Sequence, residues 1–359
     1  MSDSGFNAEE DFVGTVEPEG ADRLDVDRLA HWLRENVAGF AGPFHLSKFK
    51  GGQSNPSYCI DAASGRYVLR RKPFGPLLPS AHAVDREYRV QAALHPTGFP
   101  VARQYGLCRD DDVIGSMFYV MALVDGHTIW NGAMPNADVA ERSATYRAMT
   151  QTLAALHNVD VEAAGLGDYG KPGNYFGRQV ERWTKQYRLS ETEEMPSMEA
   201  LIRFLPATLP EQSRTSIVHG DFRIDNMIFE NGVPRVAAVL DWELSTLGDP
   251  LADFTYFCLA WVTDNGGRSG VADLDRKALG IPELEQVVEA YAGATGRDKI
   301  PDMNWYFAYN FFRLAGIMQG IKKRVIDGTA SSAHAKTMSA RVEPLAQRAW
   351  HFARLAGAD

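Results

Sequence analysis

Residues 219–226 read HGDFRIDN, in which Asp221 is followed five residues later by Asn226. Fifteen residues further on, the apolar run 236–240 ends at Asp241. A carboxylate such as Asp221 can accept the proton of a hydroxyl nucleophile. The oxygens of Asn226 and Asp241 suit Mg²⁺, which prefers hard oxygen ligands and keeps several waters. A base and two metal ligands at this spacing are parts that phosphoryl transfer from ATP requires.

A β-hairpin is predicted between the octapeptide and Asp241. Asn231-Gly232 separates the apolar runs 227–229 and 235–240, and Asn-Gly between such runs is a strong hairpin signal. The alternative is a surface turn that contains Asp and Asn by chance, and it does not account for the hairpin. His219 is expected to pack against the loop and hydrogen-bond it. Asp225 is expected to cap the turn rather than bind metal.

Length and composition indicate a globular protein of one large domain or two lobes. The chain has 359 residues, 45% of them hydrophobic, and no apolar run approaches the roughly 18 residues that span a bilayer. The N-terminal residues lack the basic and apolar regions of a secretory signal. Cys59, Cys108 and Cys258 lie far apart, which argues against a disulfide framework and a zinc site. We therefore expect a cytoplasmic protein that does not bind membranes.

The net charge of −9 comes mostly from one segment. Residues 1–22 contain seven acidic residues and no Lys or Arg, so the rest of the chain carries a formal charge of about −2. No basic face for nucleic acid is indicated. The acidic segment has few large apolar residues, and we expect it to be a disordered, solubilising tail.

The order of the predicted elements indicates an α+β protein. A small β-rich region with one main helix precedes a larger, mostly helical region that contains the hairpin. Strands are predicted over residues 44–50, 57–62, 66–72, 101–107 and 116–124, and helices over residues 24–37, 80–94, 138–157, 177–188, 198–205, 282–292, 303–325 and 332–355.

From about residue 24 to residue 340, the chain resembles the aminoglycoside phosphotransferase family of protein-kinase-like enzymes. The likeness is carried by GGQSNPSY, YVLRRKPFGPLLPSAHAVDREYRV, HGDFRIDN and LDWELSTLGDPLADF. It is closest to the branch that is fused to acyl-CoA dehydrogenases or found beside them. The resemblance implies a two-lobed fold, with residues 1–22 as the tail, 23–125 as a nucleotide-binding N-lobe and 126–359 as a C-lobe with the catalytic loop, the metal site and the acceptor site.

The resemblance also implies cofactors and a substrate class. ATP and Mg²⁺ would be the cofactors, with Asp221 as the base and Asn226 and Asp241 as metal ligands. Enzymes of this branch phosphorylate the hydroxyl of 4-hydroxyacyl-CoA compounds, which suggests an acyl-CoA acceptor and a functional link to an acyl-CoA dehydrogenase. The Asp-Phe-Gly triplet of kinases is here Asp-Trp-Glu. Glu243 either approaches a second magnesium ion or faces solvent or forms a salt bridge.

The phosphate anchor departs from the family pattern, because the resemblance places Arg70 where a Lys is usual. Side chains alternate along a strand, so Val68, Arg70 and Lys72 share one face. Val68 would cover the adenine and Arg70 would reach the phosphates, with Lys72 as the alternative anchor. Glu87 lies within the apolar stripe of the next helix, where a carboxylate needs a cation such as Arg70. The alternative is an exposed Glu at the edge of the stripe.

Two further segments are candidate nucleotide contacts. In the turn that begins at Gly51, backbone N–H groups can meet phosphate oxygens, although such a turn also suits an ordinary hairpin. After the strand 116–124, a backbone carbonyl and N–H would meet the adenine edge, although an edge strand is the simpler interpretation. The residues concerned are Gly51, Gly52, Ser54 and Asn55 in the turn, and Met121, Ala122 and Val124 in the hinge.

Asp249 precedes Pro250 and is predicted to cap a helix. Asp253 is predicted to brace the catalytic loop through its backbone or through Arg223. The aromatic and basic residues of 175–187 either line an acyl-CoA pocket or form the core face of an amphipathic helix, and the helix is favoured. The basic run 322–324 either meets CoA phosphates or suits the C-terminal end of a helix.

The sequence therefore favours a magnesium-dependent kinase for a small molecule, with a hydroxyacyl-CoA or hydroxy acid as acceptor. The near-neutral body disfavours an aminoglycoside, since a polycation would favour an acidic cleft. Choline- and homoserine-like acceptors stay open. A catalytically silent binding module is the second hypothesis, with Arg70 in its support. A metal hydrolase ranks last, because no further His or carboxylate cluster has ligand spacing.

Overall fold

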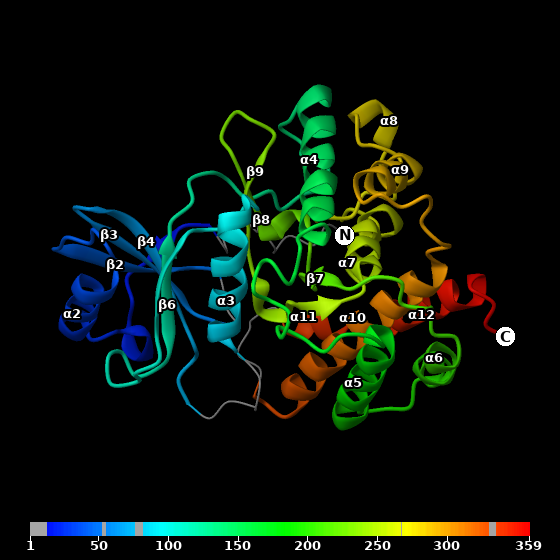
Figure 1. The fold of residues 1–359 in the computed structure, drawn as a ribbon. Helices are drawn as coiled ribbons and strands as arrows, with labels where there is room; N and C mark the ends of the chain where they lie inside the picture. Colours follow the sequence, from blue (N-terminus) through cyan, green and yellow to red (C-terminus); the bar gives the residue numbers. More distant parts are fainter. Residues whose placement is uncertain (1–12, 52–54, 76–81, 267, 330–334) are drawn as a thin grey trace.

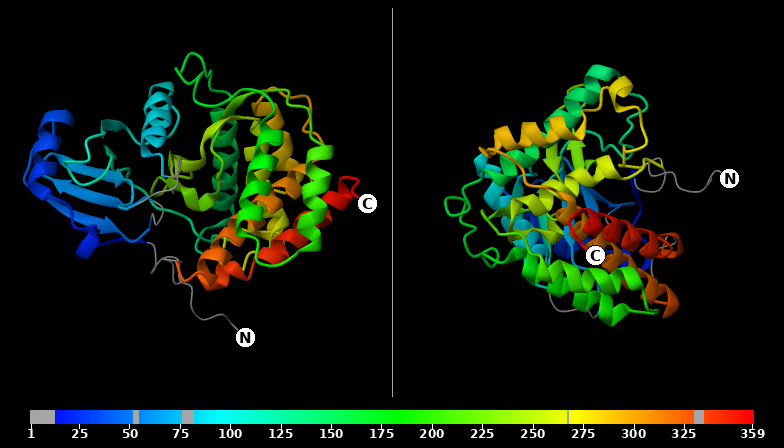
Figure 2. Two further views of the ribbon diagram at one scale, coloured as in Figure 1. Left: turned by 90° about the horizontal axis from the view of Figure 1, so that it is seen from below. Right: turned by 90° about the vertical axis from the view of Figure 1, so that its right-hand side faces the viewer.

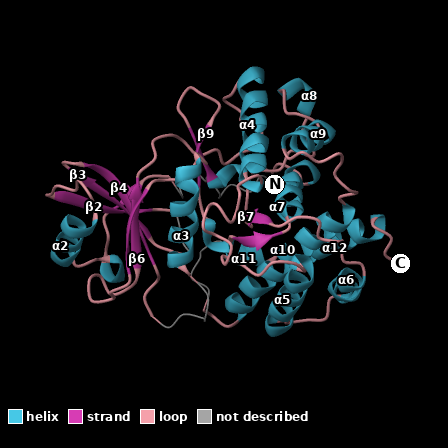
Figure 3. Cartoon of the chain, viewed as in Figure 1, coloured by secondary structure: helices cyan, strands magenta, loops and turns pink. Residues whose placement is uncertain are grey.

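The computed structural model describes residues 13–51, 55–75, 82–266, 268–329 and 335–359. Strands gather at one end of the molecule and helices at the other, as Figure 3 shows. The main sheet is antiparallel, with the order β1-β2-β3-β4-β6-β5. Its strands are β1 (Thr15–Val16), β2 (Phe44–Phe49), β3 (Ser57–Ala62), β4 (Gly65–Arg71), β5 (Gln104–Cys108) and β6 (Phe118–Ala122).

The sheet and the helix α2 (Val26–Asn36) share a hydrophobic core of their own. Leu29 and Leu33 are fully buried on one side of α2, at the spacing of one helical turn. They belong to the same core cluster as Tyr58 and Leu69 of the sheet. The helix begins after Asp25, whose carboxylate accepts the Arg28 N–H at 3.0 Å.

Helix α3 (Val84–Leu94) lies beside the sheet, where the sheet approaches the helical part (Figure 1). Val90 and Leu94 are fully buried in the large core cluster of the helical part. Glu87 of the same helix instead contacts β4. Because one helix contacts both parts, it fixes residues of the sheet relative to the loops on the other side.

The helical part is larger and follows β6 in the sequence, and the C-terminus lies at its far end in Figures 1 and 2. It embeds two short antiparallel pairs, β7 (Ser216–Val218) with β10 (Thr246–Gly248) and β8 (Met227–Phe229) with β9 (Val236–Val239). Its helices are α4 (Val139–His157), α5 (Tyr175–Ser190), α6 (Pro196–Ala207), α7 (Pro250–Phe257), α8 (Arg276–Leu279), α9 (Leu284–Ala294), α10 (Asn304–Ile326), α11 (Ala335–Ser339) and α12 (Val342–Leu355).

The predicted α+β plan, a β-rich part followed by a mostly helical part, is confirmed. Two details of the prediction differ from the structure. The single helix expected over residues 332–355 is wrong, since α11 ends at Ser339 and α12 begins at Val342. A continuous helix would direct the ring of Pro344 at the carbonyl of Ala340 and leave that carbonyl without an N–H donor. The helix therefore restarts within the turn before Pro344.

The expectation of an unstructured acidic tail does not hold for residues 13–22. Thr15–Val16 pairs with β2 as an edge strand, and Gly20–Asp22 forms a turn of 3₁₀ helix. Asp22 forms an ion pair with Lys48 at 2.5 Å, and its carbonyl accepts the Tyr58 hydroxyl at 2.9 Å. Residues 1–12 lie outside the described part. None of the described helices is both long and apolar enough to cross a bilayer.

Candidate active site

The catalytic loop lies between β7 and β8, and its entry requires a glycine. Gly220 has a φ of +88°, and a Cβ at this position would lie 2.9 Å from the Leu244 carbonyl oxygen. The backbone therefore approaches the segment after Asp241 more closely than any side chain would allow. This close approach brings Asp221 to the end of the β8–β9 hairpin.

Asp221 and Asn226 lie together, as the spacing predicted. The Asn226 amide nitrogen donates to the main-chain carbonyl of Asp221 and to its Oδ2, both at 2.9 Å. Because both donations use the nitrogen, the amide oxygen of Asn226 points away from Asp221. A cation on that side would meet an oxygen ligand.

Asp241 lies beside Asn226 because of the hairpin register. Met227 pairs with Val239, and the Leu240 N–H donates to the Asn226 carbonyl at 2.8 Å. Asp241 adopts a left-handed backbone conformation with φ +63° and ψ +62°. Aspartate tolerates this region better than most residues. The turn directs its carboxylate toward β4, where Arg70 donates to Oδ1 at 2.9 Å.

The donor set fits Mg²⁺ better than a softer metal. Asn226 offers a neutral oxygen and Asp241 a charged one, and Mg²⁺ is commonly bound by one or two such groups together with phosphates and water. Within the described residues, no group of three His, Cys, Asp or Glu side chains is arranged to hold a metal ion. The protein residues therefore supply only part of a coordination sphere, which leaves positions for phosphate oxygens.

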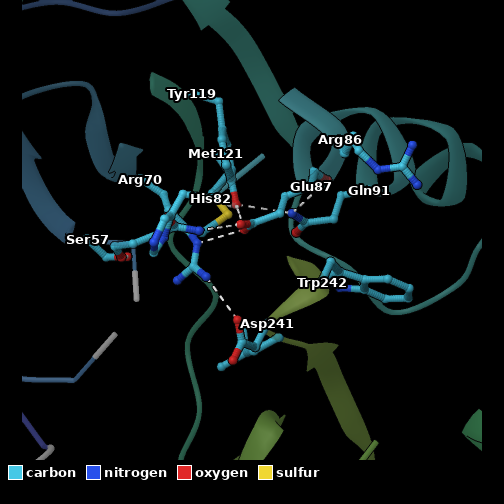
Figure 4. A network of polar contacts seen from close by, with 12 residues as sticks. Ser57, Arg70, His82, Arg86, Glu87, Gln91, Tyr119, Met121, Asp241 and Trp242 are labelled. Carbon is cyan, nitrogen blue, oxygen red and sulfur yellow. Dashed lines mark hydrogen bonds and ion pairs between the residues drawn. The ribbon is translucent and has the colours of Figure 1, made fainter. Parts of the chain in front are cut away.

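Arg70 joins the sheet to the hairpin, as Figure 4 shows. Its Nε donates to Glu87 Oε2 at 2.7 Å, while its terminal nitrogen binds Asp241. Glu87 is 1% exposed, so the alternative of a solvent-facing Glu is wrong. Burial lowers the pKa of Arg70, but the charges of Glu87 and Asp241 outweigh it and raise that pKa. Arg70 is thus a fixed cation at the predicted phosphate position.

Glu87 is held by more donors than the sequence indicated. Its Oε1 accepts the Asn55 side-chain amide at 2.6 Å, and its Oε2 accepts the Tyr119 hydroxyl at 3.2 Å. The Asn55 oxygen contacts His82 Nδ1 at 2.9 Å. The buried side chain of Asn55 braces Glu87, and the predicted contact of its backbone with a phosphate stays a prediction.

The other predicted nucleotide residues fall in three groups. Val68 and Met121 are cross-strand partners in β4 and β6, next to Arg70. The Ala122 N–H donates to the Arg103 carbonyl at 2.8 Å, and Val124 follows the end of β6. Gly51 follows β2, whereas Gly52 and Ser54 lie outside the described residues. Contacts of these residues with a nucleotide stay predictions.

Buried side chains hold the main chain of the catalytic loop. Asp253, 1% exposed, accepts the N–H groups of His219 and Gly220, the latter at 2.7 Å. The His219 ring accepts the Asp221 N–H at 3.2 Å and donates through Nε2 to the Leu240 carbonyl at 2.8 Å. The structural role predicted for His219 and the backbone bracing predicted for Asp253 are therefore confirmed.

Two further predictions about this loop are decided. Asp249 accepts the Leu251 N–H at 2.9 Å and caps α7, as expected. Arg223 pairs with Asp225 rather than with Asp253. Asp225 is thus engaged by Arg223 and does not face the Asn226–Asp241 pair as a ligand.

The ionisation of the carboxylates follows from their surroundings. Burial raises the pKa of Asp221, but the charge of Arg223, the Tyr256 hydroxyl and the charge of Arg313 outweigh burial and lower that pKa below its usual value. Asp221 is therefore ionised at neutral pH. Burial and the neighbouring charge of Asp241 raise the pKa of Glu243 to about 7.

A cavity of about 480 Å³ lies in the helical part next to the catalytic loop, and residues 222–225 of the loop line it, whereas Asp221 does not. Tyr256, which donates its hydroxyl to Asp221 Oδ1 at 2.5 Å, is part of its wall. Most of the lining is apolar, from α7, α10 and the segments around them. Three guanidinium groups, of Arg223, Arg268 and Arg341, and two carboxylates, of Asp225 and Asp264, also line it, and Arg223 is paired with Asp225.

The helix α5 does not contribute to this cavity. Tyr175, Trp183 and Tyr187 are buried in the core, so the amphipathic-helix interpretation is confirmed. Lys322 pairs with Glu193, and Lys323 pairs with Asp327 at 2.5 Å.

Tyr256 and Arg313 contact the catalytic loop, and neither was predicted from the sequence. Tyr256 lies one helical turn after Asp253, and that spacing was a usable signal, whereas Arg313 is distant in sequence and had none.

Comparisons with known proteins agree with this geometry. The profile of the Phosphotransferase enzyme family matches residues 45–298. Acyl-CoA dehydrogenase family member 10 of Mus musculus is 46% identical over 318 residues, which is 88% of this chain and 30% of that protein. Acyl-CoA dehydrogenase family member 11 of Gallus gallus is 40% identical over 93% of this chain and 44% of that protein. The chain thus spans less than half of these relatives.

Solved structures include a protein of Ralstonia eutropha that is classed provisionally as an aminoglycoside phosphotransferase. It is 49% identical, has a TM-score of 0.85, and the match covers 93% of this chain and 99% of that one. A mutant of the aminoglycoside phosphotransferase APH(4)-Ia, in complex with ADP and hygromycin B, has a TM-score of 0.57. It is 15% identical over 92% of this chain and 98% of that one, so it shows a likeness of fold.

Proposed function

Because this chain belongs to the phosphotransferase enzyme family, we propose that it is an ATP- and Mg²⁺-dependent kinase that phosphorylates a hydroxyl group of a small molecule. One observation carries the proposal. The Asp241 carboxylate binds Arg70 of the sheet, the preceding residue Leu240 is bonded through its N–H to the Asn226 carbonyl, and the Asn226 amide is bonded to Asp221. A base, two oxygen ligands and a fixed cation thus converge where the two parts meet.

Asp221 would take the proton of the acceptor hydroxyl while the hydroxyl oxygen bonds to the γ-phosphorus and ADP leaves. Its lowered pKa keeps it ionised and ready to accept that proton. The transition state of phosphoryl transfer is loose, so alignment of the acceptor contributes more than the strength of the base. The contacts that fix Asp221 are therefore expected to matter as much as its charge.

The nucleotide would lie against β4 and β6, with Val68 and Met121 at the adenine and Arg70 at the phosphates. Asn226 and Asp241 would hold Mg²⁺, which neutralises the charge that develops on the phosphate oxygens. The ADP complex of a structural neighbour supports the use of a nucleotide. The Arg70–Glu87 ion pair argues against the silent module, because Arg70 retains the acidic partner that an anchoring cation needs.

The cavity beside Asp221 favours an acceptor with an apolar chain and an anionic group. Partial desolvation, and then the neighbouring charges of Arg268 and Arg223, lower the pKa of Arg341, so the three guanidinium groups face a common region. Three guanidinium groups face two carboxylates, of Asp225 and Asp264, in this lining, and the excess of one positive charge disfavours a polycationic aminoglycoside there. The names of the relatives point to acyl-CoA chemistry, and we propose a 4-hydroxyacyl-CoA or a hydroxy acid as the acceptor.

A screen of acceptors tests the proposal. ATP consumption and ³¹P NMR of the product would be measured with 4-hydroxyacyl-CoA, free hydroxy acids, choline and kanamycin. We expect a phosphorylated product from the CoA thioester or the hydroxy acid, and none from kanamycin. If no acceptor is phosphorylated and millimolar Mg-ATP leaves the melting temperature unchanged, the chain is a silent module instead.

A further inference from the structure

Helix α7 contacts the catalytic loop along one face. Asp253 and Tyr256 are three residues apart, so their side chains lie on the same side of the helix. Asp253 binds the main chain of the loop at Gly220, and Tyr256 binds the carboxylate of Asp221. Every residue of α7 is buried, and Asp249 caps its first turn. The helix is therefore a rigid support for both contacts.

Both oxygens of the Asp221 carboxylate have a donor. The Tyr256 hydroxyl is 2.5 Å from Oδ1, and the Asn226 amide nitrogen is 2.9 Å from Oδ2. Each carboxylate oxygen has two acceptor positions, so an acceptor hydroxyl can still bind. Burial, and then the charge of Asp221, raise the pKa of Tyr256 well above its usual value, which keeps its hydroxyl a donor.

The ring of Tyr256 is itself held in place. The guanidinium of Arg313 lies 5.1 Å from the centre of this ring, on its face, and it also donates to the Gly220 carbonyl. Arg313 extends from α10 and is 6% exposed. Tyr256 is 6% exposed and forms part of the cavity wall. Its hydroxyl is thus fixed at the boundary between Asp221 and the cavity.

We propose that Tyr256 is a positioning residue that holds the Asp221 carboxylate in the orientation in which it accepts the proton of the acceptor hydroxyl. The inference rests on the proposed kinase function. Without the Tyr256 hydroxyl, the Asn226 amide is the remaining hydrogen-bond donor to the Asp221 carboxylate among the described residues, and the side chain can turn about its torsions. Misalignment of this kind lowers turnover without weakening nucleotide binding, because Tyr256 contacts Asp221 and Arg313 and not Arg70, the proposed phosphate anchor.

The variant Tyr256→Phe removes the hydroxyl and keeps the ring beneath Arg313. We expect kcat for the best acceptor of the screen to fall about 10- to 100-fold, while the KM for Mg-ATP changes less than about twofold. Tyr67→Phe is a matched control. Tyr67 is 5% exposed, its hydroxyl lies 3.1 Å from Ser64 Oγ, and its ring belongs to the core of the sheet, away from α7. This control should keep its kcat.

Crystal structures of both variants give a readout that needs no turnover. In Tyr256→Phe the Asp221 side chain should leave its position or occupy several, and in Tyr67→Phe it should stay. An unchanged kcat or an unmoved Asp221 in Tyr256→Phe would overturn the inference, as would an equal loss of kcat in both variants. If the wild type phosphorylates no acceptor, the proposed function has failed, and the position of Asp221 still decides this inference.

Discussion

The two sides of the candidate site hold their charged groups in different ways. Around Arg70, side chains hold one another, since Glu87 accepts bonds from Arg70, Asn55 and Tyr119. Around Asp221, buried side chains of distant helices mainly hold the main chain. Asp253 of α7 accepts hydrogen bonds from two N–H groups of the loop, and Arg313 of α10 donates one to the Gly220 carbonyl.

The difference explains where the site tolerates change. A network of side chains can adjust to a different cation, and the resemblance would place Arg70 where a Lys is usual. A guanidinium donates in two directions, to Glu87 and to Asp241, which an ammonium cannot do with the same geometry. The loop has no such freedom, because Gly220 approaches Leu244 too closely to carry a side chain.

The largest effect is expected on the Asp221 side. Asp221→Asn removes the proton acceptor and preserves the shape of the side chain, so kcat should fall about 10³-fold. Isothermal titration should give a Kd for Mg-ATP within about threefold of the wild type, because the nucleotide residues are untouched. Full activity of this variant would remove Asp221 from the role of base.

On the Arg70 side, Arg70→Ala should act on both binding and stability. The KM for ATP should rise about 30-fold or more, as truncation of a buried charged partner costs several kcal/mol. The free energy of unfolding should fall by about 3–5 kcal/mol, because Glu87 is left buried without its cation. Kinetics and urea denaturation measure the two effects.

Lys72→Ala is the control for this variant, because Lys72 lies one residue beyond the end of β4. It should change both quantities little. A larger rise in the KM for ATP in Lys72→Ala than in Arg70→Ala would mean that Lys72 is the anchor.

The free energy of unfolding is expected to depend on pH through Asp249, which caps α7. Burial raises the pKa of Asp249 to about 6, so its contribution to stability is complete below its ordinary pKa of 3.8 and is lost as the pH rises through about 6. Asp249→Asn keeps a capping side chain that stays neutral. Relative to the wild type, this variant should gain on the order of 2–3 kcal/mol between pH 4 and pH 7. A pH-independent difference in denaturation midpoints would contradict the raised pKa.

The smallest effect is expected at the edge of the cavity. Arg341→Ala removes one of three guanidinium groups, and the KM for an anionic acceptor should rise about tenfold, while the KM for ATP stays constant. Raising the ionic strength should reduce the difference, because Arg341 is exposed. An unchanged KM for 4-hydroxyacyl-CoA would argue against recognition of an anion at this edge.

Local signals made much of the site predictable. The spacing of Asp221 and Asn226, the Asn-Gly turn and the strand that ends at Asp241 are each encoded within a few residues, and the hairpin brought them together as expected. Glu87 could be paired with Arg70 because a carboxylate in an apolar stripe needs a cation. These predictions depended on the periodicity of apolar residues and on turn residues, both of which can be recognised within short stretches of the chain.

The rest depended on contacts between distant segments. Arg313 lies 93 residues from the Gly220 carbonyl that it binds, and Asn55 lies 32 residues from Glu87. Neither has a pattern around it that names its partner. The break before α12 was predictable in principle, because Pro344 lies inside the stretch that was interpreted as one helix.

The left-handed backbone conformation of Asp241 costs stability, whereas its carboxylate serves the proposed reaction. Glycine would adopt φ +63° at no steric cost, so Asp241→Gly should relieve strain in the folded chain. The same change would delete one partner of Arg70 and the carboxylate that we propose binds Mg²⁺. A selection for heat tolerance alone would therefore tend to discard this aspartate, and its persistence would have to be enforced by the need to turn over substrate.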